Sequence, residues 1–274
     1  MRNLTMSDRW IAAAVQMNAG EDKEVNLQTA ERLIAEAAAQ GARLVVLPEL
    51  FNYLGRLEDL AEHAESLDGP TATRMRQAAQ KHEIFLVAGS FAELRQGDDR
   101  VSNTSLLFDP QGKQLGLYRK MHLFDIDLPD VHVHESKYVA PGDLPSVCPT
   151  ELGGLAQAIC YDLRFPELPR SLNLREVACL ALPAAFTAKT GAAHWEVLIR
   201  ARAIENQLFV IAANQFGRYV SGIQSYGHSL IVDPWGTVLA AASGDAEEII
   251  TAEISLDKLR EVRQHMPTLG HRRI

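Results

Sequence analysis

The sequence predicts a mixed α/β fold in which two β-sheets stack face to face and helices cover the outside. Short apolar strands alternate with segments whose apolar residues recur at helical spacing, and no repeat, low-complexity tract or flexible linker divides the 274 residues. Helical segments follow the first strand, the second strand and the strand before Cys160. This favours a two-sheet sandwich, although periodicity leaves a single doubly wound sheet open. We expect one continuous domain.

The first half of the chain predicts two strand–helix units and then a run of strands. An apolar strand at residues 11–17 leads into a helix whose apolar positions run over 27–38 and which Gly41 closes. A buried strand at 43–47 follows, and Pro70 opens a second helix. Further strands are expected at 84–91, 101–108 and 113–119, the last two joined by the turn 109–112.

The second half predicts another strand–helix–strand unit and a group of strands near the C-terminus. An irregular stretch covers residues 121–142, and a strand at 155–159 is followed by a helix at 166–176 and a buried strand at 177–182. Residues 192–206 form a strongly helical segment. The remaining strands are expected at 208–214, 228–232, 238–241 and 247–254, with a turn at 233–236.

Composition excludes several classes of function. The chain carries 27 Lys and Arg against 35 Asp and Glu, a net charge of -8, which argues against nucleic-acid or anionic-membrane binding through a broad basic surface. The longest apolar run, 177–186, has 10 residues and contains Pro183, whereas a membrane helix needs about 20. The N-terminal segment lacks a secretory apolar region, and 3 cysteines without a CxxC pair fit reduced thiols. We therefore expect a cytoplasmic protein.

Three reactive side chains stand where strands are expected to end. Cys160 follows the strand 155–159, Glu49 follows 43–47, and Lys120 follows 113–119. Each alone is more readily explained by an ordinary role: a packing cysteine, a capping or surface glutamate, a solvated lysine. Together they supply a thiol, a carboxylate and an ammonium group, which is the set needed to attack a carbonyl, move a proton and stabilise an oxyanion.

The segments that contain these residues resemble those of the nitrilase-like carbon–nitrogen hydrolases. The matching motifs are Leu47-Pro48-Glu49, Tyr118-Arg119-Lys120-Met121-His122-Leu123-Phe124 and Cys160-Tyr161-Asp162-Leu163-Arg164-Phe165-Pro166-Glu167. Further likeness lies at 193–198, 200–206, 225–229 and 233–236. The resemblance implies a four-layer αββα sandwich over residues 1–274, a single carbon–nitrogen hydrolase domain that forms a homodimer or higher homo-oligomer. It also implies a covalent acyl-enzyme with neither metal nor organic cofactor.

The resemblance also assigns roles to individual residues. It makes Cys160 the nucleophile, Glu49 the general base and Lys120 the oxyanion stabiliser, assisted by the backbone N–H of Tyr161. The family's second active-site carboxylate matches Glu135. The preceding loop, 129–132, lacks the glycine often found there and is one residue short.

The substrate indicated by the resemblance is a small ω-amide. Residues 185–195 and 265–273 resemble deaminated-glutathione amidases, whereas 122–127 resembles the ω-amidases that act on α-ketoglutaramate. Both share a glutaramate-like acyl group. The substrate-binding residues expected by this likeness are Tyr161, Arg164, Phe186 and Thr190, with Arg164 pairing with a substrate carboxylate. Arg164 as a structural brace and Phe186 as a core residue remain the alternatives.

Other functions are weighed against this one. Nitrile hydrolysis would use the same three catalytic residues. His132 and His134 with Cys148 could bind zinc, and His194 or His228 could pair with a cysteine in a Cys–His hydrolase. A noncatalytic binding protein is a further class, in which the matched motifs would be relics.

Overall fold

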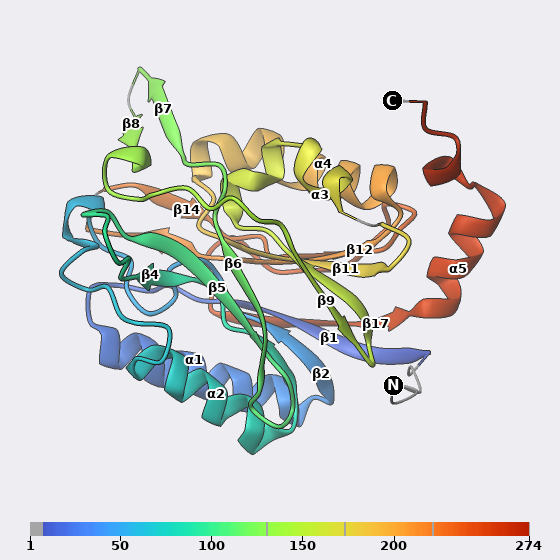
Figure 1. Cartoon of the computed structure of the whole chain (residues 1–274), viewed down its shortest axis with the longest axis horizontal. Helices are drawn as coiled ribbons and strands as arrows, with labels where there is room; N and C mark the ends of the chain where they lie inside the picture. The colour runs from blue at the N-terminus through green and yellow to red at the C-terminus, as the bar shows by residue number, and fades with distance from the viewer. Residues whose placement is uncertain (1–7, 130, 173, 221, 274) are drawn as a thin grey trace.

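Two β-sheets stack face to face, and helices cover the outer face of each, in the computed structural model of the chain (Figure 1). The structure describes residues 8–129, 131–172, 174–220 and 222–273. The layer order is α1 and α2, the first sheet, the second sheet, then α3 and α4 (Figure 1). The predicted αββα sandwich is therefore confirmed, and the doubly wound alternative is wrong.

The first sheet has 7 strands in the order β17-β1-β2-β3-β5-β4, with β6 paired to β5. Its β1–β2 and β2–β3 pairs are parallel, which brings the carboxyl ends of these strands to one edge. The strands are β1 (Arg9–Gln16), β2 (Ala42–Val46), β3 (Phe85–Val87), β4 (Phe91–Glu93), β5 (Ser102–Phe108), β6 (Gln114–Arg119) and β17 (Glu248–Ser255).

The second sheet has 6 strands in the order β16-β15-β12-β11-β10-β9. Its β10, β11 and β12 run parallel, so their carboxyl ends also share an edge. The strands are β9 (Ser146–Thr150), β10 (Gly153–Gln157), β11 (Val177–Ala184), β12 (Phe209–Asn214), β15 (Leu230–Val232) and β16 (Val238–Ala241). Two hairpins lie outside the sheets: β7 (Asp125–Leu128) with β8 (Val131–His134), and β13 (Phe216–Arg218) with β14 (Gln224–Tyr226).

Capping and first-turn residues mark where the first two helices begin. Asp22 caps α1 (Lys23–Ala39) by accepting a hydrogen bond from Val25 N, and Pro70 starts α2 (Pro70–His82). On the second sheet lie α3 (Glu167–Ser171) and the long α4 (Ala188–Asn206), while α5 (Leu256–His265) runs along one end of the sandwich (Figure 1). Short 3₁₀ turns are η1 (Leu57–Asp59), η2 (Glu135–Lys137), η3 (Cys160–Arg164) and η4 (Thr268–Gly270).

The core consists of apolar layers inside and outside the two sheets. Between the sheets, alternate residues of β1 such as Ala12 and Ala14 pack against Leu155 of β10 and Ile211 of β12. Their neighbours Ala13 and Val15 face the other way and join the cluster under α1 and α2. Both faces of the central strands are buried, which is why they read as unbroken apolar runs.

Several predicted boundaries are wrong for local reasons. The strand expected at 84–91 is divided into β3 and β4, because the chain turns at Gly89, whose φ is +43°. The helix expected at 166–176 ends at Ser171, since Leu172 adopts an extended backbone. The stretch 121–142, expected to be irregular, contains the β7–β8 hairpin and η2. The elements β9, β13, β14 and α5 were not predicted.

Candidate active site

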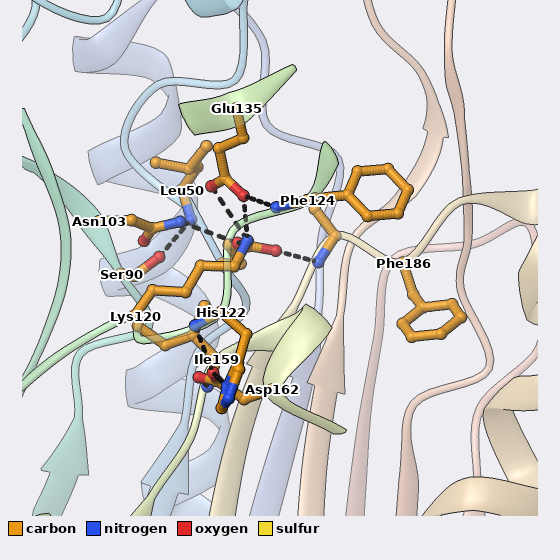
Figure 2. Close-up of polar contacts among 12 residues, drawn as sticks. Leu50, Ser90, Asn103, Lys120, His122, Phe124, Glu135, Ile159, Asp162 and Phe186 are labelled. Atoms are coloured by element: carbon orange, nitrogen blue, oxygen red, sulfur yellow. Dashed lines mark hydrogen bonds and ion pairs between the residues drawn. The ribbon is translucent and has the colours of Figure 1, made fainter. Parts of the chain in front are cut away.

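Three of the predicted catalytic side chains form one buried cluster. Lys120, directly after β6, places its Nζ 2.9 Å from Glu49 Oε1 and 3.0 and 2.9 Å from the two carboxylate oxygens of Glu135 (Figure 2). The three residues are 2–4% exposed. They come from three separate segments, so the cluster exists only in the folded chain.

Glu49 is held in place through both carboxylate oxygens. Besides Lys120, Asn103 Nδ2 donates to Oε1 over 2.8 Å, and the backbone N–H of Ala185 donates to Oε2 over 2.9 Å. Asn103 lies on β5 and Ala185 directly follows β11, so the first and second sheets both orient this carboxylate. The sequence contained no signal for either contact, because both are long-range.

Glu135 opens the turn η2, directly after the β7–β8 hairpin. The backbone N–H of Phe124 donates to its Oε2 over 2.6 Å, and the N–H of Glu135 donates back to the carbonyl of Phe124 over 3.3 Å. These contacts bring Glu135 to Lys120 although the loop before it departs from the family pattern. Residue 130 of that loop lies outside the described residues.

Cys160 begins η3 at the end of β10. Its φ is +45°, in the left-handed region that non-glycine residues adopt at a cost of about 1–3 kcal/mol. Burial raises the pKa of the Cys160 thiol well above its usual range, and the Glu49 carboxylate raises it further, against a smaller lowering by Lys120. Cys160 is therefore a neutral thiol at rest, next to a carboxylate that can accept its proton.

The cluster keeps Lys120 charged. Burial works to lower the pKa of Lys120, but the carboxylates of Glu135 and Glu49 outweigh it and raise this pKa well above its usual range. Burial raises the pKa of Glu135, and the charge of Glu49 adds to the rise, whereas Lys120 lowers it. One ammonium group thus holds two carboxylates together in a site almost closed to water.

A cavity of ≈ 830 Å³ opens above this cluster. Glu49, Lys120, Glu135 and Cys160 all line it, as do the four predicted substrate-binding residues Tyr161, Arg164, Phe186 and Thr190. The sequence-based set thus shares one cavity.

Three of the four predicted substrate-binding residues contact one another, and the fourth, Thr190, bonds with Thr187. The Arg164 guanidinium lies 4.9 Å from the centre of the Phe186 ring and 5.6 Å from that of Tyr161, and its Nη1 lies 3.2 Å from His194 Nδ1. This arrangement holds a positive charge at the cavity wall.

Tyr219, which follows β13, also lines the cavity and was not predicted. Its hydroxyl bonds with Ser225, and burial raises its pKa. Only the closure of the β13–β14 hairpin brings Tyr219 to the site.

The zinc and Cys–His alternatives receive no support from these positions. Cys148 lies in the core between the sheets, whereas His132 and His134 both contact Asp127 on the exposed β7–β8 hairpin. Over residues 8–129, 131–172, 174–220 and 222–273, no group of three or more His, Cys, Asp and Glu residues could hold a metal ion. His194 is exposed on α4, and His228 stacks on Tyr226.

The sequence profile of the carbon–nitrogen hydrolase family matches residues 11–264. This chain belongs to that family. Among similar proteins, the deaminated glutathione amidase of Synechocystis is 43% identical over 267 residues, 96% of this chain and 98% of that protein. Human omega-amidase NIT2 is 39% identical over 262 residues, 95% and 94% of the two chains.

A solved structure shows the same fold. The crystal structure of Saccharomyces cerevisiae Nit3, a member of the nitrilase superfamily, superposes with a TM-score of 0.87 at 33% identity and covers 98% of each chain. This carbon–nitrogen hydrolase is therefore a nitrilase-superfamily enzyme of the amidase type. In the part of the chain that the structure describes, no helix is both long and apolar enough to cross a membrane.

Proposed function

We propose that this carbon–nitrogen hydrolase cleaves a small ω-amide with a glutaramate-like acyl group, and that its substrate is deaminated glutathione. The observation that carries the proposal is the convergence of Cys160, Glu49, Lys120 and Glu135 at one cavity. A thiol beside a buried carboxylate and a charged ammonium group can form and hydrolyse an acyl-enzyme.

In the acylation half-reaction, Cys160 Sγ attacks the amide carbonyl carbon while its proton passes to Glu49. The carbonyl oxygen becomes an oxyanion that Lys120 and the backbone N–H of Tyr161 stabilise. Lysine has three N–H donors; one serves Glu49 and a second can serve both oxygens of Glu135, which leaves a third for the oxyanion. The proton then moves from Glu49 to the departing nitrogen as the C–N bond breaks, and an amine or ammonia leaves.

In the second half-reaction, water attacks the thioester at Cys160. Glu49 accepts the proton of the attacking water, and Lys120 again stabilises the oxyanion. The C–S bond breaks, the thiolate regains a proton from Glu49, and the carboxylic acid leaves. Glu135 keeps Lys120 charged and in position throughout, because it binds the ammonium group with both oxygens.

In this proposal Arg164 recognises the acyl group of the substrate. If Arg164 pairs with the substrate's terminal carboxylate, a methyl ester of that carboxylate loses much of its kcat/KM in the wild type and far less in Arg164→Met. Equal acid-to-ester ratios in two folded proteins would instead make Arg164 a brace for Tyr161 and Phe186.

The size and charge of the cavity favour deaminated glutathione over α-ketoglutaramate. At ≈ 830 Å³ the cavity lies in the upper part of the range of about 300–1,000 Å³ that small-molecule sites span. It is therefore large for α-ketoglutaramate, whose acyl group has five carbons and whose leaving group is only ammonia. Arg56, Lys137 and Lys189 also line it, with Arg56 paired to Glu58 of the same wall, and this basic lining suits a leaving group with its own carboxylate. The ω-amidase reaction is the second candidate, favoured by the similarity to human omega-amidase NIT2.

Matched assays of the purified protein separate these functions. We expect kcat/KM to be highest for deaminated glutathione, lower for α-ketoglutaramate and lowest for a simple nitrile. A reversed order of the first two makes the protein an ω-amidase, and nitrile preference makes it a nitrilase. Absence of turnover and of Cys160 acylation with all three would indicate a noncatalytic binding protein.

We further propose that the enzyme acts in the cytoplasm as a homodimer or higher homo-oligomer. Cys148, Cys160 and Cys179 are free thiols, which suits a reducing compartment. Light scattering after size-exclusion chromatography gives the oligomeric state, and an undiminished rate after exhaustive dialysis against a chelator tests the proposal that no metal is needed.

A further inference from the structure

The proposed reaction requires Lys120 and Cys160 to act on one carbonyl group, yet they are carried by different sheets. Lys120 follows β6 of the first sheet, and Cys160 follows β10 of the second. A displacement of about 1 Å between such groups can cost about 100-fold in rate. The reaction therefore needs a contact that fixes the segment of Lys120 relative to that of Cys160.

We propose that Asp162 is a positioning residue that sets the placement of Cys160 relative to Lys120, an inference that rests on the proposed roles of these two residues. Asp162 is 1% exposed and lies two positions after Cys160 in η3. Its carboxylate binds residues that flank both Cys160 and Lys120.

On the lysine side, Asp162 binds the residues two positions before and two after Lys120. Tyr118 Oη donates to Asp162 Oδ2 over 2.7 Å, and the backbone N–H of His122 donates to Oδ1 over 3.0 Å. His122 Nδ1 lies 2.7 Å from the same Oδ1, so this nitrogen carries the proton. The His122 ring also stacks on Phe165 at 3.8 Å between centres, which fixes its orientation.

On the cysteine side, Asp162 stabilises the turn that presents the nucleophile. The backbone N–H of Ile159 donates to Asp162 Oδ2 over 2.9 Å, and the N–H of Asp162 donates to the carbonyl of Ile159 over 3.0 Å. These two bonds enclose Cys160, whose left-handed backbone persists only if its surroundings impose it. Figure 2 shows Ile159, His122 and Asp162 as one cluster beneath the Lys120 side chain.

Asp162 acts through these neighbours rather than on the substrate. The cavity is lined by Cys160, Tyr161 and Arg164 of η3. The carboxylate of Asp162 instead accepts hydrogen bonds from Tyr118, His122 and Ile159. Its loss should therefore lower kcat and leave KM nearly unchanged.

The main test is Asp162→Asn, with Asp233→Asn as the matched control. The amide keeps one oxygen but turns an NH₂ group toward N–H or O–H donors, so either the contacts with His122 or those with Tyr118 and Ile159 are lost. Asp233 is also buried and accepts backbone N–H bonds from Trp235 and Thr237, in a turn between β15 and β16. We measure kcat, KM, melting temperature and the rate at which iodoacetamide alkylates Cys160, read from the mass of the Cys160 peptide.

We expect Asp162→Asn to lower kcat by about 100-fold and to slow alkylation of Cys160, with little change in KM. Asp233→Asn should lose stability but keep kcat and the alkylation rate. Equal kcat and alkylation rates in the wild type and a folded Asp162→Asn would overturn the proposal, as would a higher KM at unchanged kcat, which would mean that Asp162 binds substrate.

Two milder comparisons decide the matter if Asp162→Asn does not fold. Tyr118→Phe removes one donor and should lower kcat by about 5- to 10-fold, the loss of one hydrogen bond. His122→Asn keeps a donor close to the position of Nδ1 and should retain most activity, whereas His122→Leu should not. Equal rates for Asn and Leu at position 122, together with an unchanged Tyr118→Phe, contradict the proposal.

The alkylation rate also separates this proposal from the proposed function. If the wild type hydrolyses none of the amides yet Cys160 alkylation slows when Asp162 or Tyr118 is replaced, the substrate assignment fails and the positioning role stands. If the amides are hydrolysed and alkylation is insensitive to both substitutions, the positioning role fails alone.

Discussion

At the scale of single residues, the site depends on a thiol that is protonated until the substrate arrives. Cys160 is beside Glu49 and is buried, and both conditions favour the neutral thiol. In the proposed mechanism the thiolate of Cys160 therefore forms during attack, by proton transfer to Glu49, and is not present beforehand. The Lys120 ammonium group is accordingly paired with the carboxylates of Glu49 and Glu135 rather than with a resting thiolate.

Cys160→Ala should abolish turnover and leave the fold intact, because it removes the nucleophile and only a small buried volume. Cys179→Ala is the matched control, since Cys179 is likewise a buried free cysteine but lies between the sheets on β11, away from the cavity. Steady-state kinetics and thermal melts measure both variants. Activity in a folded Cys160→Ala, or its loss in a folded Cys179→Ala, would show that the wrong thiol has been assigned.

Lys120→Arg should lose most activity although the charge is retained. The Nζ of Lys120 fits within 3.0 Å of oxygens from both Glu49 and Glu135, and a planar guanidinium cannot occupy that compact position. We expect a fall in kcat of about 100-fold or more, the cost of losing an oxyanion donor. A rate near that of the wild type would mean that Lys120 contributes only a diffuse positive field.

At the scale of elements, short turns decide where the catalytic side chains stand. Gly89 divides β3 from β4 with a left-handed φ of +43°, and a Cβ there would overlap the carbonyl oxygen of Pro48, next to Glu49. Gly97 also has a positive φ, +79°, but has nothing within 4 Å of its would-be Cβ. Substitutions at these two glycines therefore distinguish the effect of steric overlap from that of backbone strain.

Gly89→Ala should destabilise the protein by about 3 kcal/mol or more and lower kcat, because relief of the overlap must displace Pro48 and Glu49. Gly97→Ala should cost only about 1–2 kcal/mol, the strain of a left-handed backbone, and should not change kcat. Chemical denaturation measures the change in stability of each variant, and steady-state kinetics measure the change in kcat. Equal losses of stability at the two positions would contradict the steric explanation.

The segment that joins β2 to α2 is anchored by Glu65, whose carboxylate accepts hydrogen bonds from Lys23 of α1 and from Thr71 of α2. Burial works to raise the pKa of Glu65, but these bonds outweigh it and lower the pKa below its ordinary 4.5. A lowered pKa in the folded state means that the carboxylate stabilises the fold above pH 4.5 and loses this effect as the pH falls through the folded-state pKa.

We expect Glu65→Gln to cost about 2 kcal/mol at neutral pH. The difference from the wild type should shrink as the pH falls below 4.5. Urea unfolding of both proteins at a series of pH values measures the difference. A difference that is constant down to the pH of acid unfolding would show that the ionised carboxylate is not the source of the stabilisation.

At the scale of the whole molecule, the two sheets share one core, so we predict a single cooperative unfolding transition. Trp10 packs between the sheets, whereas Trp195 lies on α4 and packs against the outer face of the second sheet. Loss of far-ultraviolet circular dichroism and change in tryptophan fluorescence should therefore coincide in urea. Separate transitions would show that the chain unfolds as two units.

Much of the fold was predictable because buried strands and helices appear in the sequence as apolar runs or as apolar residues at regular spacing. The strands β2, β10 and β11 lie buried on both faces, and their apolar runs predicted them to within a few residues. The hairpin β13–β14 was missed because its strands have only three residues each. The hairpin β7–β8 was missed although Asp125–Leu128 and Val131–His134 both alternate polar and apolar residues, because each run has only four residues. The helix α5 follows β17 without a break and was missed although Ser255, its N-cap, and Asp257 in its first turn mark the start of a helix.

By itself, the sequence determined the αββα class, the carbon–nitrogen hydrolase family and the candidate residues that line the cavity, because strand-end motifs and apolar periodicity are local properties. Only the tertiary structure decided that Asn103 and Ala185 orient Glu49, that Tyr219 lines the cavity, and that Asp162 connects the segments of Lys120 and Cys160. The contacts of Glu49 with Asn103 and Ala185 and that of Asp162 with Tyr118 join residues far apart in the chain. The contacts made by Ala185 and by Tyr118 also depend on how the two sheets pack, because each joins segments of different sheets. No local pattern carries that information.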